Sequence, residues 1–198
     1  MKLRAVIPDD KELADLDDAQ VMAEVQQGEP LAFRILVERH KRRAFYLALK
    51  LVGNAEDAYD ISQEAFIRVY NARRRYDRER PFYSWFYAIL SNLAKNHLKK
   101  KAVRAEYAER VRVAASDRTH HRDSPEAIVQ ADETRKNVWA AIERLSYEHR
   151  EIIVLRHFED LAYEEIAELL GIPVGSVMSR LYYARKKLRE LLGDRYER

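Results

Sequence analysis

Three carboxylates in one stretch of the sequence have the residue type and spacing of a chemical site. Asp57, Asp60 and Glu64 recur at helical intervals and therefore share one side of a helix. Carboxylates grouped in this way can hold a divalent cation or exchange protons with a substrate. However, no histidine joins them at ligand spacing, and a run of charges on an amphipathic helix is normally its solvated face. The pattern therefore does not predict catalysis or metal binding, and a basic protein partner is the sharper functional interpretation.

The helix that positions these carboxylates is predicted over residues 54–76. Asn54 stands at its cap position, and small or aliphatic side chains recur on the side opposite the carboxylates. Two helices are predicted before it, over residues 17–28 and 30–53, because Gly28 and Gly53 are natural C-terminal stops. The apolar positions expected in the core are Val21, Met22 and Val25 in the first helix, Leu31, Ile35, Leu36, Phe45, Leu49 and Val52 in the second, and Ala58, Ile61, Ala65 and Val69 in the third.

A second stretch combines aromatic and basic residues in the pattern of a nucleic-acid site. Five aromatic residues crowd between Phe82 and Tyr87, and amide and lysine side chains follow along one side of the same predicted helix. These are Asn92, Lys95, Asn96, Lys99 and Lys100. Aromatic residues in a helix are mostly core, which is our expectation for Trp85, Phe86 and Ile89. Aromatic rings beside amides and lysines also hold single-stranded DNA, by stacking on unpaired bases and neutralising phosphates. Both interpretations can be true of different residues.

Residues 161–188 predict two helices joined by a sharp turn. Gly171 supplies the positive φ that ends the first helix, and Pro173 prevents its simple continuation. The buried positions expected are Ile166, Ala167 and Leu170 in the first helix and Val177, Leu181, Ala184 and Leu188 in the second. The second helix is otherwise basic and carries the small polar residues Ser176 and Ser179 near its start, the end that enters the major groove in a helix-turn-helix. The stretch therefore predicts binding to duplex DNA.

The composition of the 198 residues is that of an all-helical protein with packed cores. Hydrophobic residues make up 47% of the chain, with only five glycines and five prolines. The absence of cysteine excludes disulfides and thiolate metal sites and suits a reducing compartment. His120 and His121 have no further ligand nearby in the sequence, so no metal or other cofactor is predicted. The sequence shows no signal peptide and no membrane-spanning run, so we expect a soluble cytoplasmic chain without membrane insertion.

Four segments are predicted along the chain. They are a polar tail at residues 1–16, a helical domain at 17–101, a linker at 102–124 and a second helical domain at 125–198. The linker is inferred because helical periodicity fades after Lys101, apart from an optional helical continuation around Tyr107 to Val113, and because Ser116 to Asp123 is polar. Ser124 and Pro125 have the pattern of a helix start. The N-terminal part is rich in acids, whereas the segment from Lys95 to Arg104 has five bases and no acid, which indicates more than one kind of macromolecular partner.

Taken in order, these segments resemble the extracytoplasmic-function (ECF) sigma factors of the bacterial sigma-70 family. Three motifs carry the resemblance: DAYDISQEAF from Asp57, FYSWFYAI from Phe82 and LRHFEDLAYEEIAELLGIPVGSV from Leu155. The match extends from about Asp17 to Leu192. A single helix-turn-helix is weak evidence for a family, whereas three motifs in the same order are strong. The resemblance implies an all-α chain of two small helical domains, sigma region 2 and sigma region 4, joined by a flexible linker.

The resemblance also implies roles for particular residues. The acidic helix should bind the coiled coil of the RNA polymerase beta-prime subunit through Asp57, Asp60, Gln63 and Glu64. The residues expected to recognise and melt the minus-ten promoter element, with one unpaired base in a pocket, are Ala72, Tyr76, Trp85, Asn92, Lys95, Asn96 and Lys99. Those expected to bind the minus-thirty-five element as duplex are Ser176, Met178, Ser179, Arg180, Tyr182, Tyr183, Arg185 and Lys186.

The partners that the resemblance implies are core RNA polymerase, contacted also at its beta flap, promoter DNA and a separate anti-sigma factor. Such a protein directs the polymerase in a stress or envelope response and has no catalytic chemistry of its own. Met178 and Tyr183 depart from the family pattern, because family members often have a basic residue at these positions. The minus-thirty-five sequence is therefore not inferable from relatives, since methionine can touch a thymine methyl group but cannot donate two hydrogen bonds to guanine.

Two rival functions belong to other classes. A dimeric repressor or activator of duplex operators needs no polymerase and leaves the aromatic and basic helix unexplained. An enzyme with an appended DNA-binding domain is disfavoured, because the sequence has no phosphate-cradling glycine loop, nucleophile elbow or His-Glu-x-x-His pattern. The acidic helix favours a sigma factor over a repressor. Negatively charged DNA does not bind an acidic surface, whereas a sigma factor needs a surface that binds the polymerase.

Overall fold

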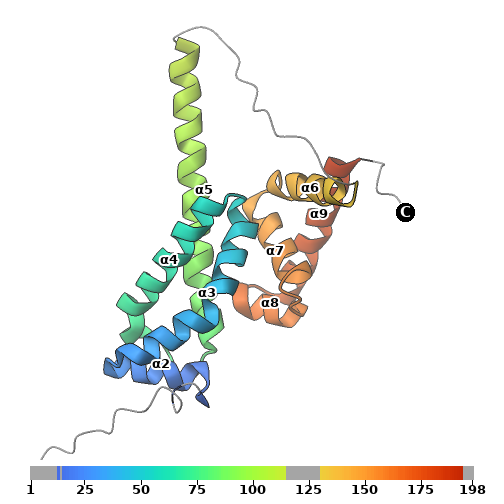
Figure 1. Ribbon diagram of the computed structural model, residues 1–198. Coiled ribbons are helices and arrows are strands. Elements are labelled where there is room, and N and C mark those ends of the chain that lie inside the picture. The colour runs from blue at the N-terminus through green and yellow to red at the C-terminus, as the bar shows by residue number, and fades with distance from the viewer. Residues whose placement is uncertain (1–12, 14, 115–129, 194–198) are drawn as a thin grey trace, which may run out of the picture. The chain divides into compact units, whose positions relative to one another are not determined.

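The structure is a computed structural model that describes residue 13, residues 15–114 and residues 130–193, with side chains described up to residue 108 and again from residue 136. Regular structure in this part of the chain is entirely helical, which confirms the predicted fold class. The chain forms two compact units, and their boundary falls after Leu93, inside the longest helix, α5 (Figure 1). Among the described helices, none combines the length and the hydropathy of a membrane span.

The first unit contains α2 (Asp18–Gln27), α3 (Pro30–Val52), α4 (Ala55–Ala72), the short 3-10 helix η1 (Arg73–Arg75) and the start of α5 (Phe82–Ala114). The Asp17 carboxylate caps α2 by accepting a hydrogen bond from the Gln20 amide at 2.8 Å. Left-handed backbone conformations, with φ of 99° at Gly28 and 75° at Gly53, end α2 and α3. The helix stops predicted at these two glycines are confirmed.

The core of the first unit forms where α3 packs against α2 and α4. The predicted core positions of α2 and α4 are confirmed, since each is at most 5% exposed: Val21, Met22, Val25, Ala58, Ile61, Ala65 and Val69. Of the positions predicted in α3, Leu36 and Val52 are buried, whereas Leu31, Ile35, Phe45 and Leu49 are half-buried. At the start of α5, Phe86 is 1% exposed and its ring lies 4.9 Å from that of Phe66 in α4. Trp85 and Ile89 are only half-buried. The core prediction therefore holds for Phe86, while Trp85 keeps an accessible surface.

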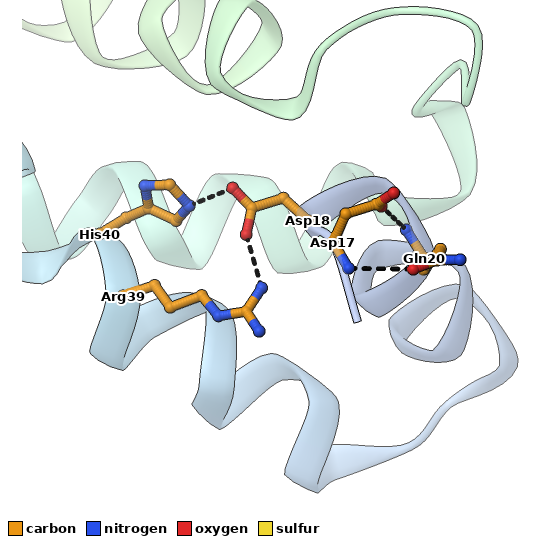
Figure 2. A network of polar contacts seen from close by, with 5 residues as sticks. All are labelled: Asp17, Asp18, Gln20, Arg39 and His40. Atoms are coloured by element: carbon orange, nitrogen blue, oxygen red, sulfur yellow. Dashed lines mark hydrogen bonds and ion pairs between the residues drawn. The ribbon is translucent and has the colours of Figure 1, made fainter. Parts of the chain in front are cut away.

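A polar network holds α2 against α3 (Figure 2). The Asp18 carboxylate pairs with the Arg39 guanidinium at 2.9 Å and with Nε2 of His40 at 2.6 Å. The His40 ring lies 5.3 Å from the ring of Phe82 at the start of α5. The hydrogen bond with His40 lowers the pKa of Asp18, against the opposing effect of burial and with the help of Arg39. The network thus connects α2 to the aromatic residues of α5 through α3.

α5 continues unbroken through the stretch from Tyr107 to Val113, where the sequence allows a helical continuation. Its 33 residues span about 50 Å, and it runs to Ala114 through the first part of the linker predicted at residues 102–124. Side chains over residues 99–108 are all exposed, and helix-favouring Ala, Lys, Arg and Glu keep the segment helical without an apolar stripe. Residues 115–124 and the helix start predicted at Ser124 lie outside the described residues, as does most of the predicted N-terminal tail. The domain boundaries stay a prediction.

The second unit packs α6 (Gln130–Glu143), α7 (Tyr147–His157) and α8 (Tyr163–Leu170) against α9 (Val174–Leu192). Its core side chains with 1% exposure or less include Ile142, Ile152, Leu155 and Ile166. The guanidinium of Arg150, a residue only 7% exposed, donates to the backbone carbonyls of Glu143 and Leu145. This arginine therefore satisfies carbonyls that the C-terminal end of α6 leaves without a partner inside the helix.

Candidate nucleic-acid interface

α8 and α9 form the two angled helices that the sequence predicts. Gly171 ends α8 at a φ of 64°, and the Ile172 amide donates to the Ala167 carbonyl at 3.0 Å, which closes the last turn. The predicted buried positions are confirmed where exposure is at most 8%, at Ile166, Ala167, Val177, Leu181 and Ala184. Leu170 and Leu188 are half-buried. The pair of helices is a helix-turn-helix, with α9 as the second helix.

The exposed face of α9 carries large side chains with much apolar surface. Met178, Tyr182 and Tyr183 are 54%, 64% and 58% exposed, and the two tyrosine rings lie 5.3 Å apart in an edge-to-face arrangement. Ser179 is also exposed, but its hydroxyl donates to the Gly175 carbonyl one turn earlier at 2.9 Å. The Ser179 oxygen therefore offers a ligand acceptor lone pairs, while its proton is used within the helix.

Basic side chains lie around this apolar surface. Arg185 and Lys186 are exposed, whereas Arg180 is half-buried, as is Ser176 in the first turn of α9. A groove of about 460 Å³ is lined by Tyr163, Met178, Leu181, Tyr182, Arg185, Lys186 and Arg189. The sequence analysis did not single out Tyr163, because this residue belongs to α8 and reaches the groove only when the two helices pack. The groove combines apolar contact with positive charge, which suits a base edge beside a phosphate.

One of the basic residues predicted to bind DNA already has a partner in the second unit. Nη2 of Arg185 lies 3.3 Å from Nε2 of His157 at the end of α7. Partial burial, and then the charges of Arg185 and Arg156, lower the pKa of His157. Because the neutral imidazole is favoured, it can accept a hydrogen bond from the guanidinium and restrain Arg185 before any ligand binds.

In the first unit, aromatic residues form a packed cluster where η1 leads into α5. The ring of Tyr76 lies 5.2 Å from that of Trp85 and 6.1 Å from that of Phe82. Tyr76 is only 5% exposed, and its hydroxyl donates to the Arg80 carbonyl at 2.6 Å. Burial, and then the nearby charge of Asp17, raise the pKa of Tyr76. The structure therefore brings Tyr76 and Trp85 together, with Tyr76 as a wall of the cluster and not an open stacking surface.

The remaining residues predicted to bind unpaired DNA lie on the helices before and after this cluster. Ala72 is the last residue of α4 and is half-buried. Asn92, Lys95, Asn96 and Lys99 are all exposed on α5. Their spacing of three, four and seven residues puts them on one side of that helix. The Asn92 and Asn96 amides and the Lys99 ammonium on this side suit a nucleic-acid backbone, whereas the Lys95 ammonium is already paired with the Glu148 carboxylate at 3.0 Å.

The segment between α4 and α5 carries basic residues that the sequence analysis did not single out. Arginine occupies five of the eight positions over residues 73–80. Arg74 and Arg75 are exposed, and the Arg73 guanidinium lies 4.2 Å from the centroid of the Tyr70 ring. The run RRRYDRER is a visible signal in the sequence, but its position beside the aromatic cluster depends on the fold.

The acidic face predicted on α4 is accessible. Asp60 and Gln63 are exposed, and Asp57 and Glu64 are partly exposed. Glu64 pairs with Arg68 one turn later at 2.8 Å. In the described part of the chain, no three His, Cys, Asp or Glu side chains are grouped closely enough to hold a metal ion.

Two apolar side chains beside these acids also lie in water. Tyr59 is 56% exposed and Ile67 is 54% exposed, four residues before and four residues after Gln63. This spacing puts all three on one side of α4. Tyr59 and Ile67 were not among the predicted site residues, although their helical spacing with Gln63 was a usable signal. Exposed apolar residues bordered by charges are typical of a surface that binds another protein.

Two family models match separate parts of the chain. Sigma-70 region 2 matches residues 36–104, which include α4, η1 and the aromatic start of α5, and Sigma-70 region 4 matches residues 135–188, which include the helix-turn-helix. The two matches place the chain in the sigma-70 class of DNA-binding transcription initiation factors.

Relatives narrow this class. The chain is 34% identical to the RNA polymerase sigma-H factor of Pseudomonas aeruginosa over 188 residues, covering 91% of this chain and 96% of that protein. It is 36% identical to the ECF RNA polymerase sigma-E factor of Haemophilus influenzae over 182 residues, covering 87% and 94%. The chain therefore belongs to the ECF sigma factors, as its motifs predict.

Solved structures share the fold. CnrH, in complex with the cytosolic domain of CnrY, is matched with a TM-score of 0.63 and 26% identity over 88% of this chain and 96% of that one. The sigma factor RpoE of Bartonella quintana, in complex with the anti-sigma factor NepR, is matched with a TM-score of 0.62 over 84% and 98%, and at 20% identity it supports the fold alone.

Proposed function

We propose that the two units divide promoter recognition between them, and that α4 attaches the protein to core RNA polymerase. The observation that carries this proposal is the exposed face of α4, where Asp60 and Gln63 lie among the uncovered side chains of Tyr59 and Ile67. DNA repels acids and does not need such a face, and neither does a repressor that acts through DNA alone. A basic groove or coiled coil on a protein partner would complement it.

The polymerase contact is assigned to the coiled coil of the beta-prime subunit. Asp57, Asp60, Gln63 and Glu64 supply charge and hydrogen-bonding groups that orient the encounter. Tyr59 and Ile67 supply apolar area, whose burial contributes most of the affinity at such a surface. The second unit makes the additional contact with the beta flap that the family resemblance implies.

The first unit and the continuation of α5 beyond Leu93 bind the minus-ten element after its strands separate. Ala72, Tyr76 and Asn92 are assigned to a pocket for one unpaired base, with Trp85 beside Tyr76 as the neighbouring aromatic wall. Lys95, Asn96 and Lys99 hold the backbone of the strand. Extruding a base costs a few kcal/mol, so the pocket and the neutralised phosphates must offset that cost.

The second unit binds the minus-thirty-five element as duplex, with α9 in the major groove. The side chains assigned to base edges are those of Met178, Ser179, Tyr182 and Tyr183. Ser176 lies in the first turn of α9, the end of the helix that enters the major groove. Arg180, Arg185 and Lys186 contact phosphates.

All of these roles are binding roles, so the protein acts without catalysing a reaction itself and without a cofactor. Control falls to a separate anti-sigma factor. The related CnrH was solved with the cytosolic domain of CnrY, which supports a comparable partner for this chain. The inducing stress or envelope signal would then act by releasing the sigma factor into the cytoplasm.

A charge reversal on α4 tests the polymerase contact. The double variant Asp60→Arg with Glu64→Arg should weaken binding to core RNA polymerase on the order of a hundredfold, because like charges across an interface cost several kcal/mol. Transcription should fall with it. The matched control is Glu164→Arg with Glu168→Arg, which makes the same reversal at the same spacing on exposed positions of α8.

The two variants separate the sigma factor from a repressor. The α4 variant should keep the thermal stability of the parent, and the α8 variant should keep its affinity for core polymerase. If the α4 variant bound core polymerase as tightly as the parent did, the proposed docking face would be wrong. If the parent bound promoter duplex alone but never bound core polymerase, the repressor would be the better account.

A further inference from the structure

The side chain of Gln26 in α2 joins the segment that links α4 to α5. Its Nε2 donates to the Arg73 carbonyl at 2.9 Å and to the Tyr76 carbonyl at 3.0 Å. Its Oε1 accepts a hydrogen bond from Nε of Arg78 at 2.9 Å. Both amide protons and the amide oxygen are thus used on one short segment, about fifty residues away in the sequence.

This segment has little regular structure to fix it. Within the segment, the Tyr76 amide donates to the Arg73 carbonyl at 3.2 Å, the Arg80 amide donates to the Asp77 carbonyl at 3.1 Å, and the Glu79 amide donates to the Asp77 carboxylate at 3.1 Å. The Tyr76 hydroxyl adds one bond to Arg80. The two carbonyls that Gln26 binds belong to η1 and to Tyr76 itself. The three hydrogen bonds of Gln26 therefore fix the backbone that orients the Tyr76 ring. An amide with all three groups paired defines one geometry more strictly than apolar packing does.

We propose that Gln26 is a positioning residue for minus-ten recognition: it holds residues 73–80 so that Tyr76 and its neighbours form the base pocket before DNA binds. The inference rests on the proposed function of this surface. A pocket that is already formed does not lose conformational entropy when it captures a base, so its selectivity for that base is greater. Gln26 touches no DNA in this account and acts through Tyr76 and the arginines around it.

The variant that tests this is Gln26→Met, which keeps the length of the side chain and removes all three hydrogen bonds. Gln27→Met is the matched control, because Gln27 is exposed and bonds only to Glu24 of its own helix, at 3.3 Å. Gln26→Glu is the second variant. It keeps an acceptor for Arg78 but places carboxylate oxygens against the Arg73 and Tyr76 carbonyls.

Two readouts distinguish positioning from general stability. The first is hydrogen exchange at the backbone amides of residues 73–80 in the free full-length protein, which Gln26→Met should accelerate roughly tenfold or more relative to Gln27→Met. The second is transcription by core polymerase carrying each variant, on a promoter library with a randomised minus-ten element. Gln26→Met should reduce base discrimination at one minus-ten position by roughly tenfold, the contribution of one captured base, and leave minus-thirty-five preferences unchanged.

The outcomes for the Gln26 variants support or overturn the positioning role. If folded Gln26→Met kept the parental preference at every minus-ten position, or lost minus-ten and minus-thirty-five preferences alike, the positioning role would be wrong. If Gln26→Met did not fold, Gln26→Glu should show the same loss at a single position, and its failure to do so would overturn the proposal. If the parent itself showed no minus-ten preference, the proposed function would fail, while the exchange data would still report whether Gln26 holds the segment.

Discussion

The aromatic residues of the two units are held in opposite ways. In the first unit Tyr76 is 5% exposed and its hydroxyl is bonded to the backbone, whereas in the second unit Tyr182 and Tyr183 are more than half exposed. A surface that captures an extruded base gains from being formed in advance, because extrusion is already costly. A helix that reads a major groove needs side chains that reach outward to base edges. Under the proposed function, rigidity and exposure are therefore distributed according to the state of the DNA that each surface binds.

Removing one tyrosine from each surface gives the largest contrast. Tyr76→Ala should lower the free energy of unfolding by about 3–5 kcal/mol, because it empties a packed site. Tyr182→Ala should change that free energy by less than about 0.5 kcal/mol and instead weaken binding to a minus-thirty-five duplex. Chemical denaturation and DNA titration measure the two effects. Tyr76→Phe is the control and should lose about 1 kcal/mol with its hydrogen bond. Equal destabilisation by the two alanine variants would contradict the contrast between a buried Tyr76 and an exposed Tyr182.

Salt dependence should show which lysines of α9 lie on phosphates. Lys186→Ala removes one predicted phosphate contact, so the slope of log affinity against log salt concentration should become less steep by about 0.9 for duplex DNA bound by polymerase carrying the variant. Lys187→Ala is the matched control, because Lys187 is paired with Glu190 at 3.0 Å. Fluorescence titrations at several salt concentrations measure both slopes. An unchanged slope for Lys186→Ala would show that Lys186 does not contact a phosphate of the duplex.

The stability of the first unit should depend on pH, because the polar network of Asp18, Arg39 and His40 lies in that unit. The pKa of Asp18 is lowered in the folded state, so its charged form stabilises the fold at pH values above its ordinary pKa near 4, and this contribution is lost as the pH falls through the lowered pKa. Asp18→Asn should therefore lower the free energy of unfolding by about 1 kcal/mol at pH 7. The difference from the parent should shrink towards zero in acid. A difference that stayed constant down to about pH 3 would contradict the assigned ion pair.

The smallest expected effect is the loss of affinity when one thymine methyl group is removed from the minus-thirty-five duplex. If Met178 contacts a thymine methyl group in the minus-thirty-five element, replacing thymine by deoxyuridine at that position should weaken parental binding about fourfold, the value of one buried carbon at about 0.8 kcal/mol. Met178→Ala should be insensitive to the same replacement. Duplex titration with each deoxyuridine position in turn measures this. Equal sensitivity in parent and variant would place Met178 away from the bases.

The helices and the helix-turn-helix are predictable from the sequence because their causes are local. The stripe of Val177, Leu181 and Ala184 follows the helical period, and Gly171 and Pro173 mark the turn within a few residues. The extent of α5 is less predictable, because its last turns keep helical propensity without an apolar stripe, and the loss of periodicity resembles a linker.

The geometry around Tyr76, on the surface proposed to bind the minus-ten element, is not predictable in the same way. Tyr76 is buried by Phe82 and Trp85 across a segment that has no period to follow. The bonds that Gln26 makes join residues about fifty positions apart, and nothing in the local sequence distinguishes it from Gln27. Long-range contacts of single polar side chains emerge only when the fold brings them together.

The central claim is that this chain programs core RNA polymerase by reading two promoter elements in two different states. Transcription in vitro tests it most directly, with the purified protein and core polymerase on a library of promoter fragments and with start sites mapped. We predict initiation at defined sites only when the protein is present, with one shared element near minus ten and another near minus thirty-five. Tight binding of the protein alone to duplex DNA, with no initiation by the core enzyme, would contradict the claim.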